Sequence, residues 1–356
     1  MGDCESYLEA RIFPLARSVT GSRSAMGGNM SISTAMHQEG PRVLPDPTTT
    51  ACENSEVGAT VPPRRAAPGQ LLHRSRPSDV LISDWVRTDT DRFTLALDWP
   101  DSHPFHSPLH GRHAPSLIAE TIRQAGRLVA HAEFAVPLDH HFLMRDLNYT
   151  IEPDRAHAAA DGPPLLLDLT CSDIRRRGAC LARMTCHMVI TRGGQVVATG
   201  YGTLTSTSPA TYRRLRGDRL TALPSVRLPA PVPPATVRRA DPADVVLSPT
   251  REPLRWVLRA DPANPALFAR PNDHVPGMVL LEAVHQAAQA AVGPAGFYPA
   301  SMRLCFDRYA EFGAPCVIEA CPAADGEPGT VCLRVSARQG GQSVFSALIT
   351  GIAVSA

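Results

Sequence analysis

The segment NDHVPGMVLLEAVHQAA, residues 272–288, repeats the outline of the segment GRHAPSLIAETIRQAG, residues 111–126. Each places a proline ahead of an apolar run, and each run contains one glutamate, Glu282 or Glu120. Self-similarity over a long period indicates that one supersecondary unit occurs more than once in a chain. These segments therefore predict two copies of the same unit.

Further pairs of segments match in the same order along the chain. HRSRPSDVLIS at residues 73–83 matches VRRADPADVVLS at residues 237–248, and RGGQVVATG matches QGGQSVFSA. The offset between matched residues falls from 165 to 162 and then to 147. The loops therefore differ in length between the copies, whereas the order of the elements is the same.

Within each copy the pattern predicts one or two short strands, one long helix and four antiparallel strands. The helices are expected at residues 116–131 and 277–292, where apolar residues follow helical spacing. Alternation in segments such as LLLDLTC and CLARMTCHMVI predicts strands, and RGGQ and QGGQ predict hairpin turns. One long helix wrapped by a curled antiparallel sheet is an α+β unit.

This pattern divides the chain into four segments. Residues 1–68 lack periodicity, so we expect a disordered N-terminal extension whose removal leaves a folded and active chain. Residues 69–207 are predicted to form the first copy and residues 237–356 the second. Residues 208–236 are dense in proline, which predicts a semi-rigid linker.

The composition argues against several functional classes. A formal net charge of +1 and the lack of any apolar run of about 18 residues favour neither nucleic acid nor membrane as a partner. The acidic start MGDCESYLEARIF does not resemble a secretory signal, so we expect a cytoplasmic protein. The nine cysteines include no C-x-x-C pair, which favours reduced core thiols, with neither a metal nor a cofactor expected.

The predicted second-copy helix is apolar on nearly every face, which is the pattern of a helix enclosed by protein. A buried carboxylate such as Glu282 costs several kcal/mol unless it is paired or lines a polar cavity. Met278, Glu282 and Gln286 share one face because they are four residues apart. Pro276 and Gly277 stand at the helix start, where free N–H groups could hold an oxyanion.

These residues predict an acyl-transfer or enolisation site in which a buried glutamate is the general base. The first copy offers an equivalent candidate, because Glu120 and Gln124 have the same spacing, with Arg123 between them. The alternative is that the glutamates and glutamines only satisfy buried backbone groups.

Four motifs resemble those of the A-factor biosynthesis hotdog family: WPDSHPFHSPLHGRHAPSLIAETIRQAG, AVPLDHHFLMRDL, YRRLRG and DHVPGMVLLEAVHQAA. The resemblance covers about residues 70–356 and implies a tandem (double) hotdog fold, packed as an intramolecular pseudo-dimer. It also implies transfer of a β-ketoacyl group from an acyl carrier protein or coenzyme A thioester to dihydroxyacetone phosphate. The ester would then close toward a γ-butyrolactone, butenolide or furan signalling molecule.

The resemblance places the family's helix glutamates on Glu120 and Glu282, which are the expected catalytic residues. In the second copy the family's usual arginine is replaced by His285. We expect the acyl thioester at Gly277 and Glu282, with Arg123 holding the phosphate from across the pseudo-dimer. The expected substrate-binding residues are Gly277, Met278, Arg123, Gln124, His274, His285 and Gln286.

Other hotdog activities remain as alternatives. A β-hydroxyacyl dehydratase would pair the glutamate with a histidine fourteen residues earlier; that position is His106 in the first copy and Phe268 in the second. An acyl thioesterase would differ only in admitting water as the acceptor. A non-catalytic, ligand-binding hotdog is the alternative outside enzymology.

Two clusters of polar residues allow further readings. His103, His106, His110 and His113 could hold a metal, although Pro104, Pro108 and Gly111 prevent a regular helix there. The arginine runs at residues 175–178 and 212–219 are typical of solvated turns, and they could also dock an acidic acyl carrier protein.

Overall fold

The computed structural model describes residues 63–100, 103–158, 162–220, 228–293, 296–323 and 329–354. The expected N-terminal extension lies outside the described residues as far as residue 62. Beyond that point, β1 (Arg65–Ala66) pairs with β2 (Ile82–Asp89), and Arg65 donates to Glu133 at 3.1 Å. The first copy therefore starts at or before Arg65. A chain that starts near residue 69 would lack β1, so the expected boundary of the first copy moves to Arg65 or earlier.

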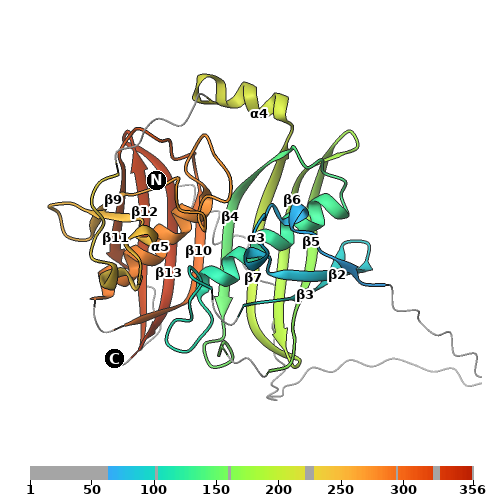
Figure 1. Ribbon diagram of the computed structural model, residues 1–356, viewed down its shortest axis with the longest axis horizontal. Helices are drawn as coiled ribbons and strands as arrows, with labels where there is room; N and C mark the ends of the chain where they lie inside the picture. Colours follow the sequence, from blue (N-terminus) through green and yellow to red (C-terminus); the bar gives the residue numbers. More distant parts are fainter. Residues whose placement is uncertain are drawn as a thin grey trace, which may run out of the picture. The chain divides into compact units, whose positions relative to one another are not determined.

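Each copy contains one long helix and a set of antiparallel strands (Figure 1). The first copy comprises β1, α2 (Gly69–Leu72), η1 (Pro77–Asp79), β2, β3 (Arg92–Leu97), α3 (Pro115–Ala132), β4 (His141–Ile151), β5 (Leu165–Arg177), β6 (Cys180–Arg192) and β7 (Gln195–Thr207). The second comprises η3 (Pro234–Val237), η4 (Pro242–Asp244), β8 (Leu247–Pro249), β9 (Arg255–Leu258), α5 (Gly277–Val292), β10 (Phe297–Phe306), β11 (Cys316–Pro322), β12 (Thr330–Gln339) and β13 (Gln342–Ala353).

The strands form one continuous antiparallel sheet across both copies, in the order β1-β2-β3-β5-β6-β7-β4-β10-β13-β12-β11-β9-β8. The copies join where β4 pairs with β10, with Leu147 opposite Leu304 and Asn148 opposite Arg303. Leu147 and Leu304 are fully buried. The predicted α+β pseudo-dimer is confirmed, since each copy supplies one half of this sheet and one central helix.

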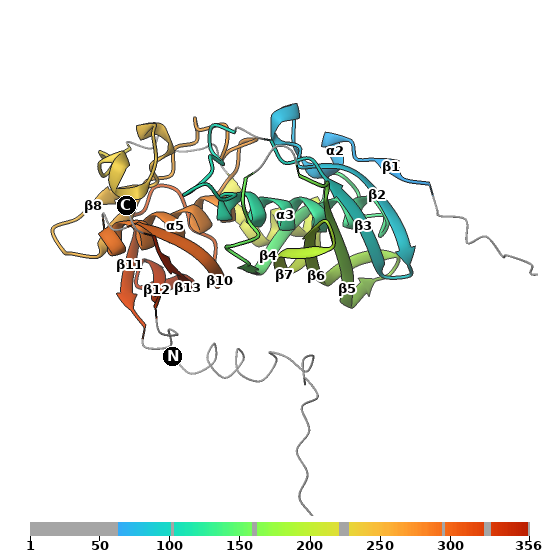
Figure 2. The same cartoon turned by 90° about the horizontal axis from the view of Figure 1, so that it is seen from below.

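The two long helices lie on the same side of the sheet, nearly in line (Figure 2). Helix α5 has the predicted bounds, and α3 extends the prediction by one residue at each end. Close approach of α3 to the sheet requires a glycine on β7, because a Cβ at Gly200 would lie 2.5 Å from the Ile122 side chain. Apolar burial between helix and sheet thus fixes where each helix lies.

The connection between the copies contains a helix that the proline pattern did not predict. Helix α4 (Pro209–Arg216) bridges the two copies and continues into η2 (Gly217–Leu220) (Figure 1). Its N-cap is Ser208, whose hydroxyl accepts from the Thr211 N–H at 3.3 Å, and Pro209 occupies the first turn. The linker is therefore partly a folded element.

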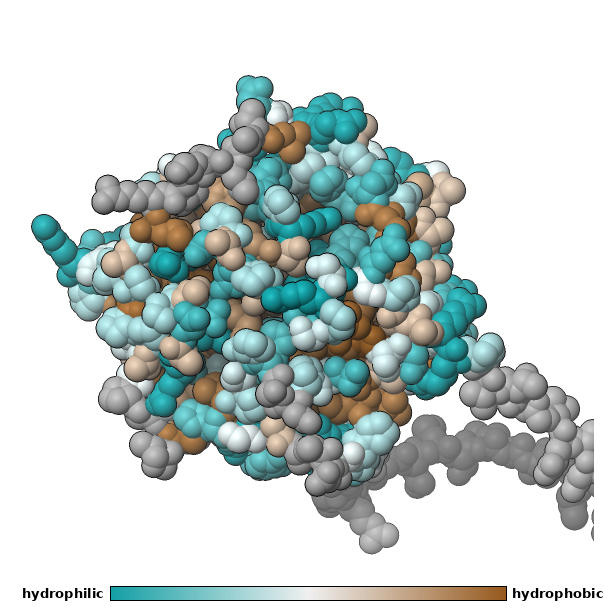
Figure 3. All heavy atoms as spheres, viewed as in Figure 1, coloured by the Kyte–Doolittle hydropathy of each residue, from teal (hydrophilic) through white to brown (hydrophobic). Residues whose placement is uncertain are grey.

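The face shown in Figure 3 mixes hydrophilic side chains with separate hydrophobic patches. No helix in the described part of the chain is long and apolar enough to span a membrane.

We predict that Gly351→Ala is strongly destabilising. Gly351 lies on β13, and a Cβ there would stand 2.2 Å from the Tyr298 carbonyl oxygen, a backbone atom that cannot rotate away. Overpacking of this kind costs about 1–3 kcal/mol or more, measurable by chemical denaturation. The control is Gly202→Ala on β7, where the nearest atom would be at 3.4 Å. Equal stability of the two variants would contradict the packing described here.

Candidate active site

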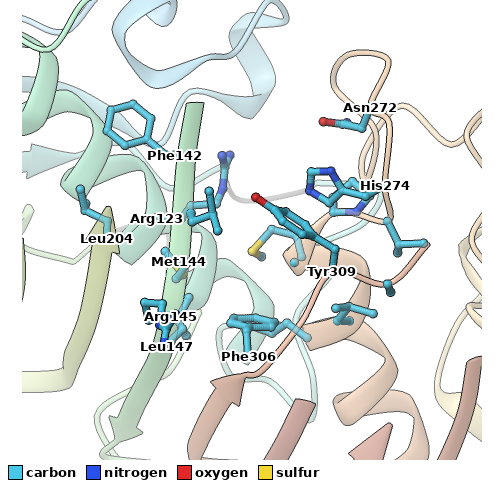
Figure 4. A pocket seen from close by; sticks show the side chains of 18 of the residues that line it. Arg123, Phe142, Met144, Arg145, Leu147, Leu204, Asn272, His274, Phe306 and Tyr309 are labelled. Atoms are coloured by element: carbon cyan, nitrogen blue, oxygen red, sulfur yellow. The ribbon is translucent and has the colours of Figure 1, made fainter. Parts of the chain in front are cut away.

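A cavity of about 450 Å³ lies where the two copies meet. Its walls come from the start of α5, the loop before it, strand β4, the segment after β10 and one face of α3. Figure 4 shows Arg123, Phe142 and Arg145 of the first copy facing His274, Phe306 and Tyr309 of the second. Cavities of this size hold small molecules and cofactor-sized ligands.

One side of the cavity is strongly basic. Arg123 and Arg127 project from α3, and Arg270 lies in the loop before α5. Arg74, Arg145 and Arg308 also line the cavity. Guanidinium groups recognise phosphate through parallel hydrogen bonds, so this wall suits a phosphorylated ligand.

Arg127 is the clearest sign of an anion site. Its contact in the structure is with the Phe142 ring, 6.0 Å from the guanidinium carbon, and no ion pair of the described residues includes it. Burial lowers the pKa of Arg127 well below its usual range, and the positive charge of Arg123 lowers it further. A partly buried cation that makes no ion pair is favoured by a nearby counter-charge, which a bound anion would supply.

Another part of the cavity lining is apolar. Leu143, Met144 and Leu147 come from β4, and Leu280 and Leu281 come from α5. Leu204 of β7 and Phe306 of β10 extend this surface. The cavity lining therefore combines a cluster of arginines with an apolar surface that suits a hydrocarbon chain.

The start of α5 opens onto the cavity. Pro276 is the N-cap, and its carbonyl accepts from the Val279 N–H at 2.9 Å. Among the hydrogen bonds of the described residues, none uses the N–H of Gly277 or Met278. A Cβ at Gly277 would touch the Phe306 ring at 3.4 Å, an ordinary contact. Glycine thus leaves cavity space beside two free donors at the positive end of a helix.

Glu120 does not line this cavity but anchors two of its arginines. Its carboxylate accepts from Arg123 Nε at 2.7 Å and from Gln124 Nε2 at 2.7 Å, and it pairs with Arg74 Nη2 at 2.6 Å. Burial alone would raise the pKa of Glu120, but Arg123 and Arg74 hold it well below its usual range. The raised pKa expected for a buried glutamate base is therefore not found at Glu120.

Glu282 faces a different part of the molecule. Its Oε1 accepts from Arg239 Nη2 at 2.6 Å and from Gln286 Nε2 at 2.7 Å. Its Oε2 is buried without a hydrogen-bond partner and lies 4.0 Å from His285 Nδ1. Arg239 also donates to the Phe105 carbonyl of the first copy at 2.5 Å. The structure thus does not bring Glu282 to the cavity beside Gly277.

The two predicted glutamines hold the backbone of their own copies. Gln124 Oε1 accepts from the Leu81 N–H at 3.0 Å, and Gln286 Oε1 accepts from the Val246 N–H at 2.9 Å. These contacts fit the alternative in which the helix amides satisfy buried backbone groups. Neither glutamine lines the cavity.

The two copies have diverged at matching helix positions. At the offset of 162, His285 corresponds to Arg123 and Gln289 to Arg127, so α5 lacks both arginines. Burial and the charge of Arg239 lower the pKa of His285 to about 3. His285 is therefore neutral at physiological pH, and its Nε2 hydrogen-bonds with the Tyr149 hydroxyl at 2.7 Å.

The start of α3 differs from the start of α5 in its first residue and in the aromatic side chains near it. Pro115 stands where α5 has Gly277, and the fully buried Tyr298 donates its hydroxyl to the His113 carbonyl at 3.0 Å. Phe105 is buried beside Arg239, whose guanidinium carbon lies 4.2 Å from its ring centre. Aromatic side chains thus fill the space at α3 that is open at α5.

The four histidines before α3 have different partners, although the rings of His103 and His106 lie 4.7 Å apart. His103 Nε2 contacts Asp79 at 3.2 Å, and His106 Nδ1 hydrogen-bonds with Ser116 at 3.0 Å. His113 contacts Arg192 at 2.9 Å. In the described ranges, no group of three or more metal-binding side chains is placed to hold a metal ion. His106, the histidine of the dehydratase alternative, does not hydrogen-bond with Glu120.

Arg127, Arg270 and Tyr309 are among the cavity residues that sequence reasoning missed. Arg127 follows Arg123 by four residues, so helical spacing could have revealed that they share a face. Arg270 and Tyr309 lie in irregular segments, where spacing carries no such signal. The hydroxyl of Tyr309 is buried and has no hydrogen-bond partner among the described residues.

Two helices wrapped by one shared sheet, with a ligand cavity at their junction, define a double hotdog protein. The chain belongs to the family of the A-factor biosynthesis hotdog domain, whose model matches residues 59–208 and 222–355. It is 46% identical to a 2-oxo-3-(phosphooxy)propyl 3-oxoalkanoate synthase of Streptomyces virginiae over 79% of this chain and 96% of that protein. Proteins of the same name from Streptomyces coelicolor and Streptomyces griseus are 43% and 41% identical, over 81% and 79% of this chain and 92% and 94% of theirs.

We predict that inorganic phosphate raises the Tm of the wild-type protein. At a free phosphate concentration 100-fold above Kd, the gain in unfolding free energy is about 2.7 kcal/mol. Arg127→Gln introduces the residue found at the matching position of α5, and it should remove most of this gain. It should also raise the Tm measured without phosphate, because a partly buried cation without an ion pair is lost. A phosphate response unchanged by Arg127→Gln would show that the anion binds elsewhere.

Proposed function

We propose that this protein is a 2-oxo-3-(phosphooxy)propyl 3-oxoalkanoate synthase, as its relatives are named. It transfers a β-ketoacyl group from a thioester to dihydroxyacetone phosphate. The observation that carries the proposal is one cavity that joins a cluster of arginines to an apolar wall beside a free helix N-terminus. Each of these three parts matches one part of the reacting pair.

The phosphate of the acceptor binds the basic wall. Arg127 makes no ion pair among the described residues, whereas Arg123 is oriented by Glu120 and presents a fixed guanidinium edge. A doubly charged phosphate would neutralise Arg127 and Arg270 together. In the proposed arrangement the phosphate lies between α3 and the loop before α5, with the acceptor hydroxyl directed toward the start of α5.

The acyl chain of the donor lies against the leucines of β4 and α5. Its thioester carbonyl then meets the free N–H groups of Gly277 and Met278. These donors stabilise negative charge that develops on the carbonyl oxygen during attack. Because they are preorganised at a helix start, they need no rearrangement as the charge forms.

The cavity geometry supports acyl transfer over the two other hotdog activities, thioester hydrolysis and dehydration. A thioesterase does not need a phosphate-binding wall for its acceptor, because that acceptor is water. A dehydratase needs a histidine and an acid at one reacting carbon, but His106 hydrogen-bonds with Ser116 and Glu120 pairs with arginines. Transfer to a phosphorylated alcohol accounts for both walls of the cavity.

The thioester reaches the cavity on coenzyme A or on an acyl carrier protein, since both present a pantetheine arm. Arg213 and Arg214 are exposed on α4, and Leu215 beside them lines the cavity while 65% exposed. This basic, partly apolar helix favours an acidic carrier protein.

If α4 docks a carrier protein, the double variant Arg213→Ser and Arg214→Ser should lower kcat/KM for the carrier-bound thioester and not for the coenzyme A thioester.

The seven described cysteines are all free, as expected for a cytoplasmic enzyme.

Mass spectrometry of the products tests the proposed reaction. We expect purified protein with a β-ketoacyl thioester and dihydroxyacetone phosphate to form the phosphorylated ester. Free β-keto acid as the main product would instead indicate a thioesterase. With a β-hydroxyacyl thioester, formation of an enoyl thioester would indicate a dehydratase.

Gly277→Ala should separate activity from stability in this assay. The added methyl group meets only the Phe306 ring at an ordinary contact distance, so unfolding free energy should change little. The methyl group would occupy the space where the thioester approaches the helix start, so ester formation should fall by about 10²-fold or more, as when an oxyanion donor is lost. Wild-type turnover in this variant would refute the placement of the thioester carbonyl at α5.

A further inference from the structure

His274 stands on the cavity wall beside the helix start that receives the thioester (Figure 4). It precedes Val275, whose N–H donates to the Ala310 carbonyl at 2.9 Å and so fixes this loop against the segment after β10. The His274 ring packs edge-on against Tyr309, with ring centres 4.5 Å apart. Its side chain is 21% exposed. His274 is therefore held in place and accessible from the cavity.

The hydrogen bonds around His274 determine which ring nitrogen carries the proton. Tyr212 of α4 donates its single hydroxyl proton to Asp273 Oδ1 at 2.7 Å. His274 Nδ1 lies 3.1 Å from the same carboxylate oxygen and 3.2 Å from the Tyr212 oxygen. An ionised carboxylate only accepts, so Nδ1 must be the donor. In neutral His274, Nε2 then carries the lone pair, and no hydrogen bond among the described residues occupies it.

Asp273 is itself fixed by the helix that links the copies. Arg216 of α4 donates to Asp273 Oδ2 at 2.6 Å and to Glu311 at 2.8 and 2.7 Å, and its side chain is 1% exposed. Burial works against ionisation of Asp273, but hydrogen bonds from His274, Tyr212 and Arg216 keep the pKa of this carboxyl well below its usual range. Asp273 therefore remains an anion that orients His274.

We propose that His274 is the general base of the acyl transfer, with Asp273 as its positioning residue. Resting on the function proposed above, the step begins when Nε2 takes the proton of the acceptor hydroxyl. The oxygen attacks the thioester carbon, and a new C–O bond forms. The C–S bond then breaks, and the leaving thiolate takes the proton back from Nε2. One ester and one free thiol result, with no other reactant needed.

Geometry favours His274 over the two buried glutamates for this role. Glu120 is fully engaged by arginines, and Glu282 lies outside the cavity. His274 stands three residues before Gly277, so one short segment supplies both the base and the oxyanion donors. A neutral imidazole oriented by a carboxylate is the arrangement that activates a hydroxyl in acyl-transfer enzymes.

The first test is His274→Gln in the full-length protein, with His187→Gln as the matched control. His187 is exposed on β6 and contacts Ser172, away from the cavity. We expect kcat for ester formation to fall by about 10²–10⁴ in His274→Gln, while the Tm gain with inorganic phosphate stays at its wild-type value. The control should retain wild-type kcat. A His274→Gln variant within about tenfold of wild-type turnover would overturn the proposal.

A second measurement separates a base from a residue that only shapes the cavity. In an analogue of dihydroxyacetone phosphate with a thiol as the attacking group, the nucleophile ionises on its own near pH 8.5. His274→Gln and Asp273→Asn should therefore lose far less activity with the thiol acceptor than with the hydroxyl acceptor. Equal losses with both acceptors would assign His274 a structural role. Failure of the wild-type protein to form any ester would instead reject the proposed function itself.

Discussion

The antiparallel pairing of β4 with β10 is the contact on which the rest of the structure depends. Without it, each copy would expose a long sheet edge, a site of aggregation that proteins otherwise have to protect. With it, the two half-sheets become one surface, and the central helices lie nearly in line on the same side. The cavity forms at their junction, so neither copy could build it alone.

Divergence between the copies has divided the chemistry between them. The first copy keeps the arginines on its helix, and Glu120 holds Arg123 in a fixed orientation. The second keeps the open helix start with Gly277, while its helix carries neutral His285 in place of an arginine. A symmetric pair would place two arginine walls and two helix starts in two equal cavities. Here one cavity receives both contributions, and the other position is filled by Phe105 and Tyr298.

The amino-acid sequence predicted the tandem architecture because hydrophobic spacing and turn residues act locally and occur twice. The bounds of α5 follow from an apolar run that starts at Gly277 and ends before Gly293, and both limits are visible in the sequence. The side of the helix that faces the cavity could not be predicted in this way. Glu282 and Gln286 share one face, but contacts with Arg239 and Val246 turn that face toward their own copy.

The orientation of the His274 side chain was also not predictable from the sequence. Asp273 and His274 are neighbours in the sequence, but the orientation of the imidazole depends on Tyr212, which precedes them by about sixty residues. The proline-rich context of that tyrosine indicated only a spacer, because a helix of two turns leaves little periodic signal. Long-range contacts of polar side chains, rather than secondary structure, were the part that sequence patterns could not supply.

Helix α4 makes the two copies of the chain non-equivalent. A hotdog dimer of identical subunits has an isologous interface, in which every contact occurs twice. Here Tyr212 and Arg216 reach from the connecting segment to the loop of the second copy that carries Asp273, and each reaches it once. The order of the two units in the gene is therefore not interchangeable. Reversing it would leave the connecting helix at the opposite junction, where Arg112 occupies the position that matches His274.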